Sequence, residues 1–208
     1  MVISKMFLNL YILLNAGMAM DIRLLEEPRN VALIGILGAI GFSVLWIATV
    51  LIDGSWVFGE MTLSELGDPS RPADMLFNIS CILSGLVLAV FAFAMRSMQK
   101  VKLVRASMGL AGAASVFLIG VGLFPIHIDF WHGLFSWAFF LTMMTAIILS
   151  VPGDWSRGGR ARGIAGVSGF MVLVAVLLLA LTPLALAEAI AVIFIMVWVL
   201  MRSFDLIL

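Results

Sequence analysis

The feature that most constrains the fold is a run of 39 mainly apolar residues, Gly163–Met201, near the end of the chain. As one straight α-helix this run would be about 58 Å long, because each residue adds about 1.5 Å. The hydrocarbon core of a membrane is only about 30 Å thick. The run must therefore turn back on itself. Thr182-Pro183 is its strongest break, since threonine can cap a helix and proline fits the first position of the next one.

Four further apolar runs precede this one, and each has about the 20 residues that a membrane helix needs. Hydrophobic residues make up 63% of the 208-residue chain and charged residues only 12%. A soluble fold of this size could not bury so much apolar surface. We therefore predict an all-α, polytopic membrane protein, a bundle of six transmembrane helices. The six spans are expected at about residues 31–52, 75–95, 103–124, 130–151, 163–181 and 184–201.

The basic residues predict how the bundle is oriented. With six spans, eleven of the twelve Lys and Arg residues fall on one side and only Arg71 on the other. Short loops rich in Lys and Arg stay in the cytoplasm, so we expect both the N- and C-termini to be cytoplasmic in a multi-pass protein of the cell (plasma) membrane. Arg96–Arg105 and Gly153–Arg162 are expected to be short cytoplasmic turns that contact anionic lipid and carry no chemistry.

Residues 1–30 are predicted to be a lead-in segment to the membrane domain, residues 31–208. Apolar side chains between Phe7 and Leu14 share one face of a helix, which favours a short interfacial helix on the cytoplasmic side. The alternative is a non-native upstream start, because Met18 and Met20 are also available as first residues.

Polar residues on the other, outer side gather in two segments, of which the first is Leu63–Gly85. It begins as an acidic loop and enters the second span, where Asp74 is placed to cap the helix and Asn78 lies one turn further in. An amide at this depth needs hydrogen-bond partners inside the bundle. Asn78 either ties the loop backbone to the helices or lines, with the loop carboxylates, a pocket that opens outward.

The second segment contains both histidines of the chain, His127 and His132. Asp129 is expected to cap the fourth span. Neutral imidazole and carboxylate groups are good zinc ligands, so His127, Asp129 and His132 form a candidate site for zinc or another divalent ion, although their spacing matches no defined zinc motif. The alternatives are a helix cap with a hydrogen-bonded histidine, and a binding or proton-transfer role without metal. Apart from such an ion, we expect no cofactor.

Glu188 lies inside the sixth span, about 7 Å along the helix axis from Pro183. A charge in the middle of a membrane helix costs about 2.5–3.5 kcal/mol on insertion scales. Glu188 should therefore face the bundle and find a partner, for which Asn78, His132 and Ser136 are the candidates. The alternative is a shallow carboxylate that simply reaches water.

Several short motifs occur in an order that is similar to one family. They are LSELGDPSRPADMLFNISCILSG at 63–85, GVGLFP at 120–125, His132-Gly133, Phe139-Phe140 and the acidic Glu188. Together they resemble the DUF998 family of prokaryotic, often archaeal, six-span membrane proteins. The resemblance covers most of the chain from the first span onward and leaves out residues 1–28. It implies the six-span fold and the location of a site, and it implies no activity because the family has no assigned function.

Three hypotheses of function follow. In the first, the chain is an integral membrane protein whose polar, acidic pocket near the outer leaflet binds a lipid head group, an ion or a small polar molecule. In the second, it is a membrane-embedded lipid hydrolase, with or without a metal, in which His132 or Glu188 is the general base. In the third, it is a structural or partner-binding protein. The candidate pocket residues are Ser64, Glu65, Asp68, Asn78, His127, Asp129, His132 and Glu188.

Other classes are disfavoured. We expect membrane lipids as partners and no nucleic acid, because the formal net charge is zero and no basic stripe is present. An oligomer remains compatible with the sequence. The single cysteine, Cys81, rules out a disulfide within the chain. The sequence shows no repeats with broken helices, as transporters often have, and no GxSxG motif of a serine hydrolase.

Overall fold

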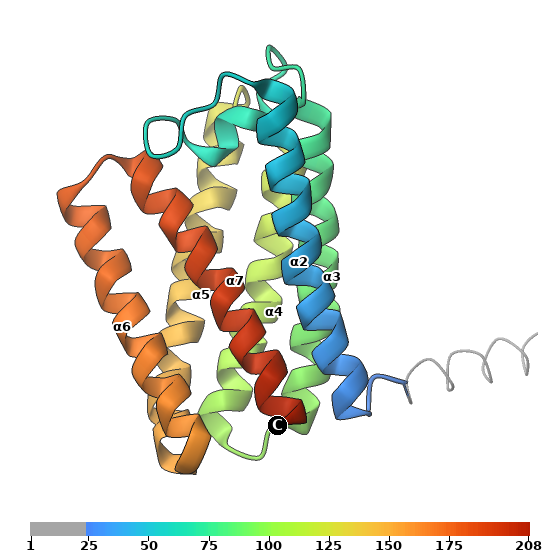
Figure 1. Ribbon diagram of the computed structural model, residues 1–208, viewed down its shortest axis with the longest axis vertical. Coiled ribbons are helices and arrows are strands. Elements are labelled where there is room, and N and C mark those ends of the chain that lie inside the picture. The colour runs from blue at the N-terminus through green and yellow to red at the C-terminus, as the bar shows by residue number, and fades with distance from the viewer. Residues whose placement is uncertain (1–23) are drawn as a thin grey trace, which may run out of the picture.

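A computed structural model describes residues 24–208, shown in Figure 1. The predicted interfacial helix and the alternative start positions lie outside the described residues. The ordered elements are α2 (Pro28–Asp53), the 3-10 helix η1 (Leu63–Gly67), α3 (Asp74–Met98), α4 (Lys102–Leu123), α5 (Asp129–Arg157), α6 (Gly159–Leu181) and α7 (Leu184–Ile207).

Within these residues, six helices are long and apolar enough to cross a membrane. Each of the six predicted spans overlaps one of them, so the all-α class and the number of apolar helices are confirmed. The helices stand side by side and alternate in direction (Figure 1). We call the end that holds residues 54–73 the upper end, and the opposite end, where the chain finishes, the lower end.

The break between α6 and α7 lies where the sequence predicts it. Thr182 ends α6, and its hydroxyl donates a hydrogen bond to the carbonyl oxygen of Leu178 at 2.7 Å. Pro183 stands at the N-cap of α7 and not at its first helical position, so Thr182 does not cap the new helix.

The predicted basic turn at Gly153–Arg162 is present but is confined to Gly158 and does not extend over the whole segment. α5 continues through Pro152 to Arg157, and α6 begins at Gly159. Gly158 alone separates the two helices and has a φ of 72°, a conformation that glycine adopts without steric cost. The other predicted basic turn lies between Met98, the end of α3, and Lys102, the start of α4.

The expected caps at Asp74 and Asp129 are also absent. Ala73 and Ile128 occupy the N-cap positions of α3 and α5, and neither helix has a side-chain cap. Both aspartates are the first helical residue of their helix. From that position a carboxylate can interact favourably with the positive end of the helix dipole without closing a cap.

Small residues bring α3 and α4 into close contact. A Cβ on Gly122 would lie 2.7 Å from Cγ1 of Ile82 and closer still to the backbone oxygen of Asn78, and a Cβ on Gly85 would lie 2.8 Å from the backbone oxygen of Ser115. Side chains larger than hydrogen therefore do not fit there without movement. Around the ring of helices, α7 packs against α2 and α6, whereas α5 and α7 touch at few positions.

The upper end of the bundle is closed by η1. Leu63 and Leu66 are buried in an apolar cluster with Phe77 and Cys81 of α3. The indole N–H of Trp56 donates to the carbonyl oxygen of Thr62 at 2.9 Å, which fixes the start of η1. This short helix therefore holds a fixed position beside the upper ends of α3 and α7.

Candidate functional site

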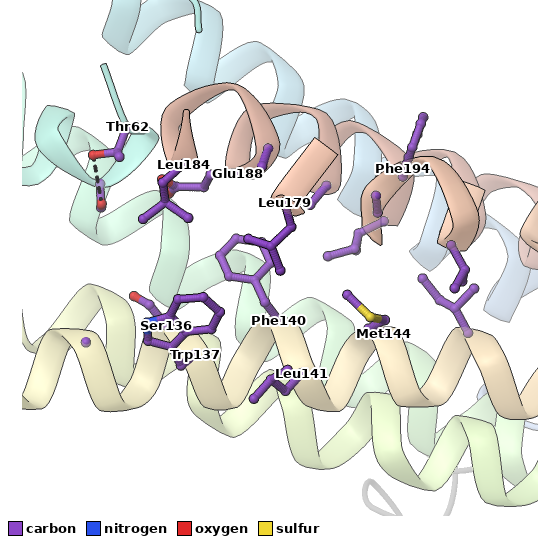
Figure 2. A pocket seen from close by; sticks show the side chains of 18 of the residues that line it. Thr62, Ser136, Trp137, Phe140, Leu141, Met144, Leu179, Leu184, Glu188 and Phe194 are labelled. Carbon is purple, nitrogen blue, oxygen red and sulfur yellow. Dashed lines mark hydrogen bonds between the residues drawn. The ribbon is translucent and has the colours of Figure 1, made fainter. Parts of the chain in front are cut away.

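A cavity of about 280 Å³ lies between α5, α6 and α7, with the start of η1 at its upper end (Figure 2). Its walls are mainly apolar. They include Phe140, Leu141 and Met144 of α5, Met171, Val172 and Leu179 of α6, and Phe194 and Ile195 of α7.

The polar residues of the cavity lie at one end of it. Thr62, Ser136 and Glu188 are at the upper end, while Met144 and Phe194 lie toward the other end (Figure 2). From Ser136 to Ile147, the last lining residue of α5, the helix axis advances about 16 Å. The cavity thus has a short polar end and a long apolar part.

His132 is buried at the polar end, and both of its ring nitrogens have partners. Nδ1 lies 2.8 Å from the carbonyl oxygen of Phe124, and Nε2 lies 3.2 Å from the hydroxyl oxygen of Ser136. A carbonyl oxygen only accepts, so Nδ1 carries the proton, and in the neutral ring Nε2 accepts from Ser136. The ring therefore links the end of α4 to the first turns of α5.

Glu188 lies in the second turn of α7, and its carboxylate faces the backbone N–H groups of Leu63 and Ser64. The first N–H groups of a helix have no acceptor within the helix, and the Glu188 carboxylate is placed near those of η1. None of its three expected side-chain partners hydrogen-bonds to it in the described chain, because Asn78 donates to Gly67 while His132 and Ser136 pair with each other.

Glu65 and Asp68 serve the loop itself and do not line the cavity. Oε1 of Glu65 accepts hydrogen bonds from the backbone N–H and the hydroxyl of Thr62, at 2.9 and 3.0 Å, and completes a capping box. The carboxylate of Asp68 accepts from the hydroxyl and the N–H of Ser70, at 2.6 and 2.8 Å. These two hydrogen bonds lower the pKa of Asp68 below its usual value.

Asn78 joins the loop to α3. Its Nδ2 donates a hydrogen bond to the carbonyl oxygen of Gly67 at 3.0 Å, and a Cβ on Gly67 would collide with the Asn78 side chain. This contact matches the first of the two sequence interpretations, in which the amide ties the loop backbone to the helices. Asn78 does not line the cavity.

His127 and Asp129 are exposed at the upper end and do not line the cavity. Over residues 24–208, no three His, Cys, Asp or Glu side chains are placed so that they could hold a metal ion. The candidate trio is not assembled because His132 turns inward, to Phe124 and Ser136, while the other two stay at the surface. Of the eight candidate pocket residues, Ser64, His132 and Glu188 line the cavity.

Sequence reasoning missed two features of the molecule. Ser136 was expected only as a partner of Glu188, although its spacing of four residues from His132 places both on one helix face. Arg71 anchors the loop to the end of α2, with its Nη1 3.1 Å from Oδ1 of Asp53 and 2.7 Å from the hydroxyl oxygen of Ser55. The sequence signal for this contact was a pair of opposite charges, Asp53 and Arg71, on either side of one outer loop.

The family described as "Protein of unknown function (DUF998)" matches residues 36–205 of the chain. The chain belongs to the DUF998 family. No curated protein and no solved structure matches it. The DUF998 match includes η1 and all the lining residues of the cavity. What the match establishes is a multi-span membrane protein of a family without an assigned function.

Proposed function

We propose that this protein binds a single-chain membrane amphiphile in the cavity between α5, α6 and α7. The head group would lie at the polar end, beside Ser64, Ser136 and Glu188, and the tail along the apolar walls. The observation that carries this proposal is the separation of polar and apolar lining along one elongated cavity. Ligand sites in proteins are mostly apolar, with a few polar groups that fix orientation.

The size of the cavity favours one tail over two. Its volume of about 280 Å³ is at the lower edge of the roughly 300–1,000 Å³ of small-molecule sites. The phenylalanine, methionine and leucine side chains along its walls match a flexible hydrocarbon chain, which needs contact area and no directed hydrogen bonds.

The proposal includes an orientation, with the upper end outside the cell and the head group in the outer leaflet. Nine of the described Lys and Arg residues lie in the lower half, and Arg71 alone lies at the upper end. The positive-inside rule supports a lower end that faces the cytoplasm.

Lipid hydrolysis is the second candidate function, favoured by one contact. The Ser136 hydroxyl lies against Nε2 of His132, and the other ring nitrogen contacts the carbonyl oxygen of Phe124. An activated nucleophile has this arrangement, a hydroxyl beside an imidazole that a third group orients. Binding is favoured over hydrolysis because the backbone N–H groups at the start of η1, which could stabilise an oxyanion, face the Glu188 carboxylate instead.

A matched pair of leucines on α6 tests the cavity. Leu179 lines it, whereas Leu177 does not, and the two are similarly exposed, at 42% and 48%. Leu179→Trp should fill the cavity and weaken the binding of a pyrene-labelled dodecanol probe to the purified full chain by about tenfold or more, a free-energy change of at least ~1.4 kcal/mol. Leu177→Trp should leave it unchanged.

Two results would overturn this assignment. Equal probe binding by both tryptophan variants would place the probe outside the cavity. Labelling of Ser136 by a fluorophosphonate, lost in Ser136→Ala, would replace simple binding with hydrolysis.

A further inference from the structure

We propose that the cavity selects an amphiphile whose head group is an ammonium, bound between the Glu188 carboxylate and the Trp137 ring. This inference rests on the proposed function and adds the chemical class of the ligand. It follows from the charge balance of the polar end and from the aromatic side chain placed there.

The cavity lining contains one carboxylate and neither lysine nor arginine. The remaining ionisable group is His132, whose hydrogen bonds to Phe124 and Ser136 can both be made by the neutral ring. The site therefore presents negative charge and hydrogen-bond acceptors to a head group. An anionic head would be repelled, and an ammonium would be attracted.

Within the described chain, Glu188 has no cationic partner. Its carboxylate faces the N–H groups of Leu63 and Ser64, and the ionisable groups that it interacts with electrostatically are Glu65, of like charge, and the thiol of Cys81. Among residues 24–208, Arg71 is the one Lys or Arg side chain at the upper end, and its guanidinium lies 3.1 Å from Oδ1 of Asp53 and 3.9 Å from Oε2 of Glu65. A carboxylate inside a membrane protein normally pairs with a cation, and here a ligand can supply that cation.

Trp137 adds a second group that suits an ammonium. It lines the cavity from α5 and remains 48% exposed. Figure 2 shows Ser136 and Trp137 on α5 across the cavity from Glu188 on α7. The face of an indole ring attracts cations, and the Ser136 and Ser64 hydroxyl oxygens can accept N–H hydrogen bonds. The head group is thus flanked by a carboxylate on one wall and an aromatic ring on the other.

The test compares three competitors that share one tail. Dodecylamine, dodecanol and dodecanoic acid would each displace pyrene-labelled dodecanol from the purified full chain in neutral detergent micelles. We expect dodecylamine to act at a concentration about tenfold lower than dodecanol, with dodecanoic acid the weakest. Glu188→Gln should abolish the advantage of the amine and leave dodecanol unchanged.

The glutamine variant keeps an acceptor oxygen for Leu63 and Ser64, so it should fold. Asp129→Asn is the matched control, because it removes an exposed charge near the same end that does not line the cavity. It should keep the preference for the amine. Trp137→Leu provides a second variant at the site, and it should reduce the amine preference while dodecanol binds as before.

The outcomes separate this inference from the proposed function. If Leu179→Trp abolishes binding but all three competitors act at equal concentration in the unmodified protein, the cavity binds amphiphiles without head-group selection and this inference fails. A preference for the amine that persists in Glu188→Gln would also overturn it. If the probe binds equally well to Leu179→Trp, the proposed function itself fails.

Discussion

Arg202 of α7 and Asp154 of α5 form an ion pair in which both side chains are completely buried. The guanidinium contacts both carboxylate oxygens, with Nη1 2.8 Å from Oδ1, and it lies 5.1 Å from the centre of the Trp198 ring. Arg157 extends the network, since its Nη1 is 3.2 Å from Asp154 and 2.6 Å from Asp205. Two acidic and two basic side chains thus join α5 and α7 at the lower end.

Asp154→Asn should strongly destabilise the bundle. It leaves Arg202 buried without its counter-charge, a loss that costs about 3–5 kcal/mol in other proteins. The double variant Asp154→Leu, Arg202→Met should recover most of that loss, because apolar replacement of a buried pair is often neutral. Thermal unfolding of the purified protein measures both effects.

The control for this pair is Arg160→Ala. Arg160 is exposed, and its Nη2 donates to the carbonyl oxygen of Leu208 at 2.9 Å. Its removal should change the unfolding free energy by less than about 0.5 kcal/mol. If Asp154→Asn were as stable as the Arg160→Ala control, the buried pair would not hold α5 to α7.

The helices could be predicted from sequence more fully than the contacts between them. Run length alone gives six spans, and Pro183 marks the sharp return between the last two. The turn expected over Gly153–Arg162 is shorter than predicted, because a helix inside a membrane protein keeps its backbone hydrogen bonds where it can, and α5 continues past Pro152 to Arg157. The pairing of Asp154 with Arg202 could not be predicted, since it depends on how α5 and α7 cross.

In the candidate site, too, sequence predicts some features and not others. Ser64, His132 and Glu188 were expected at one pocket, and they do line one cavity. Glu65 and Asp68 do not, because each accepts hydrogen bonds from residues two or three positions away in the loop. Sequence shows that an acidic loop exists, but the direction of each carboxylate depends on local turns that composition does not specify.

Gly122→Ala should destabilise the contact between α3 and α4. The added Cβ would press on the Asn78 backbone and on Ile82, and overpacking of this kind costs about 1–3 kcal/mol. Gly41→Ala is the matched control, because a Cβ at Gly41 meets nothing within 4 Å. It should leave the thermal unfolding midpoint unchanged or raise it. A Gly122→Ala midpoint equal to that of Gly41→Ala would contradict the close approach.

Asn78→Ala and Asn78→Asp should both loosen the upper loop. Alanine and ionised aspartate cannot donate a hydrogen bond to the Gly67 carbonyl oxygen. A buried acceptor that loses its donor costs about 1–3 kcal/mol of folding free energy. Cleavage after Glu60 and Glu65 by a glutamate-specific endopeptidase measures the effect, because both glutamates lie in the segment between α2 and α3. Both variants should be cut faster than the unmodified protein.

Asp74→Asn tests whether this loosening is specific to Asn78. Asp74 lies one helical turn away and makes no side-chain cap, so its replacement should leave the cleavage rate unchanged. Equal acceleration in Asp74→Asn would mean that any change near the start of α3 frees the loop. The hydrogen bond from Asn78 to Gly67 would then not be the anchor.

The orientation of the bundle can be measured with single cysteines. The native Cys81 is only 2% exposed and gives a low background with a membrane-impermeant maleimide. Ser70→Cys places a thiol at the exposed upper loop, and Ser156→Cys places one near the lower end. If the upper end faces outward, intact cells should label at position 70 at once and at position 156 only after lysis.

This labelling experiment also bears on where a ligand would enter. Glu188 lies in the second turn of α7, near the upper end, so its head-group site faces whichever leaflet that end occupies. Labelling at position 156 in intact cells, with none at position 70 before lysis, would invert the bundle. The cavity would then take its amphiphile from the cytoplasmic leaflet. The nine described basic residues of the lower half would face outward, contrary to the positive-inside rule.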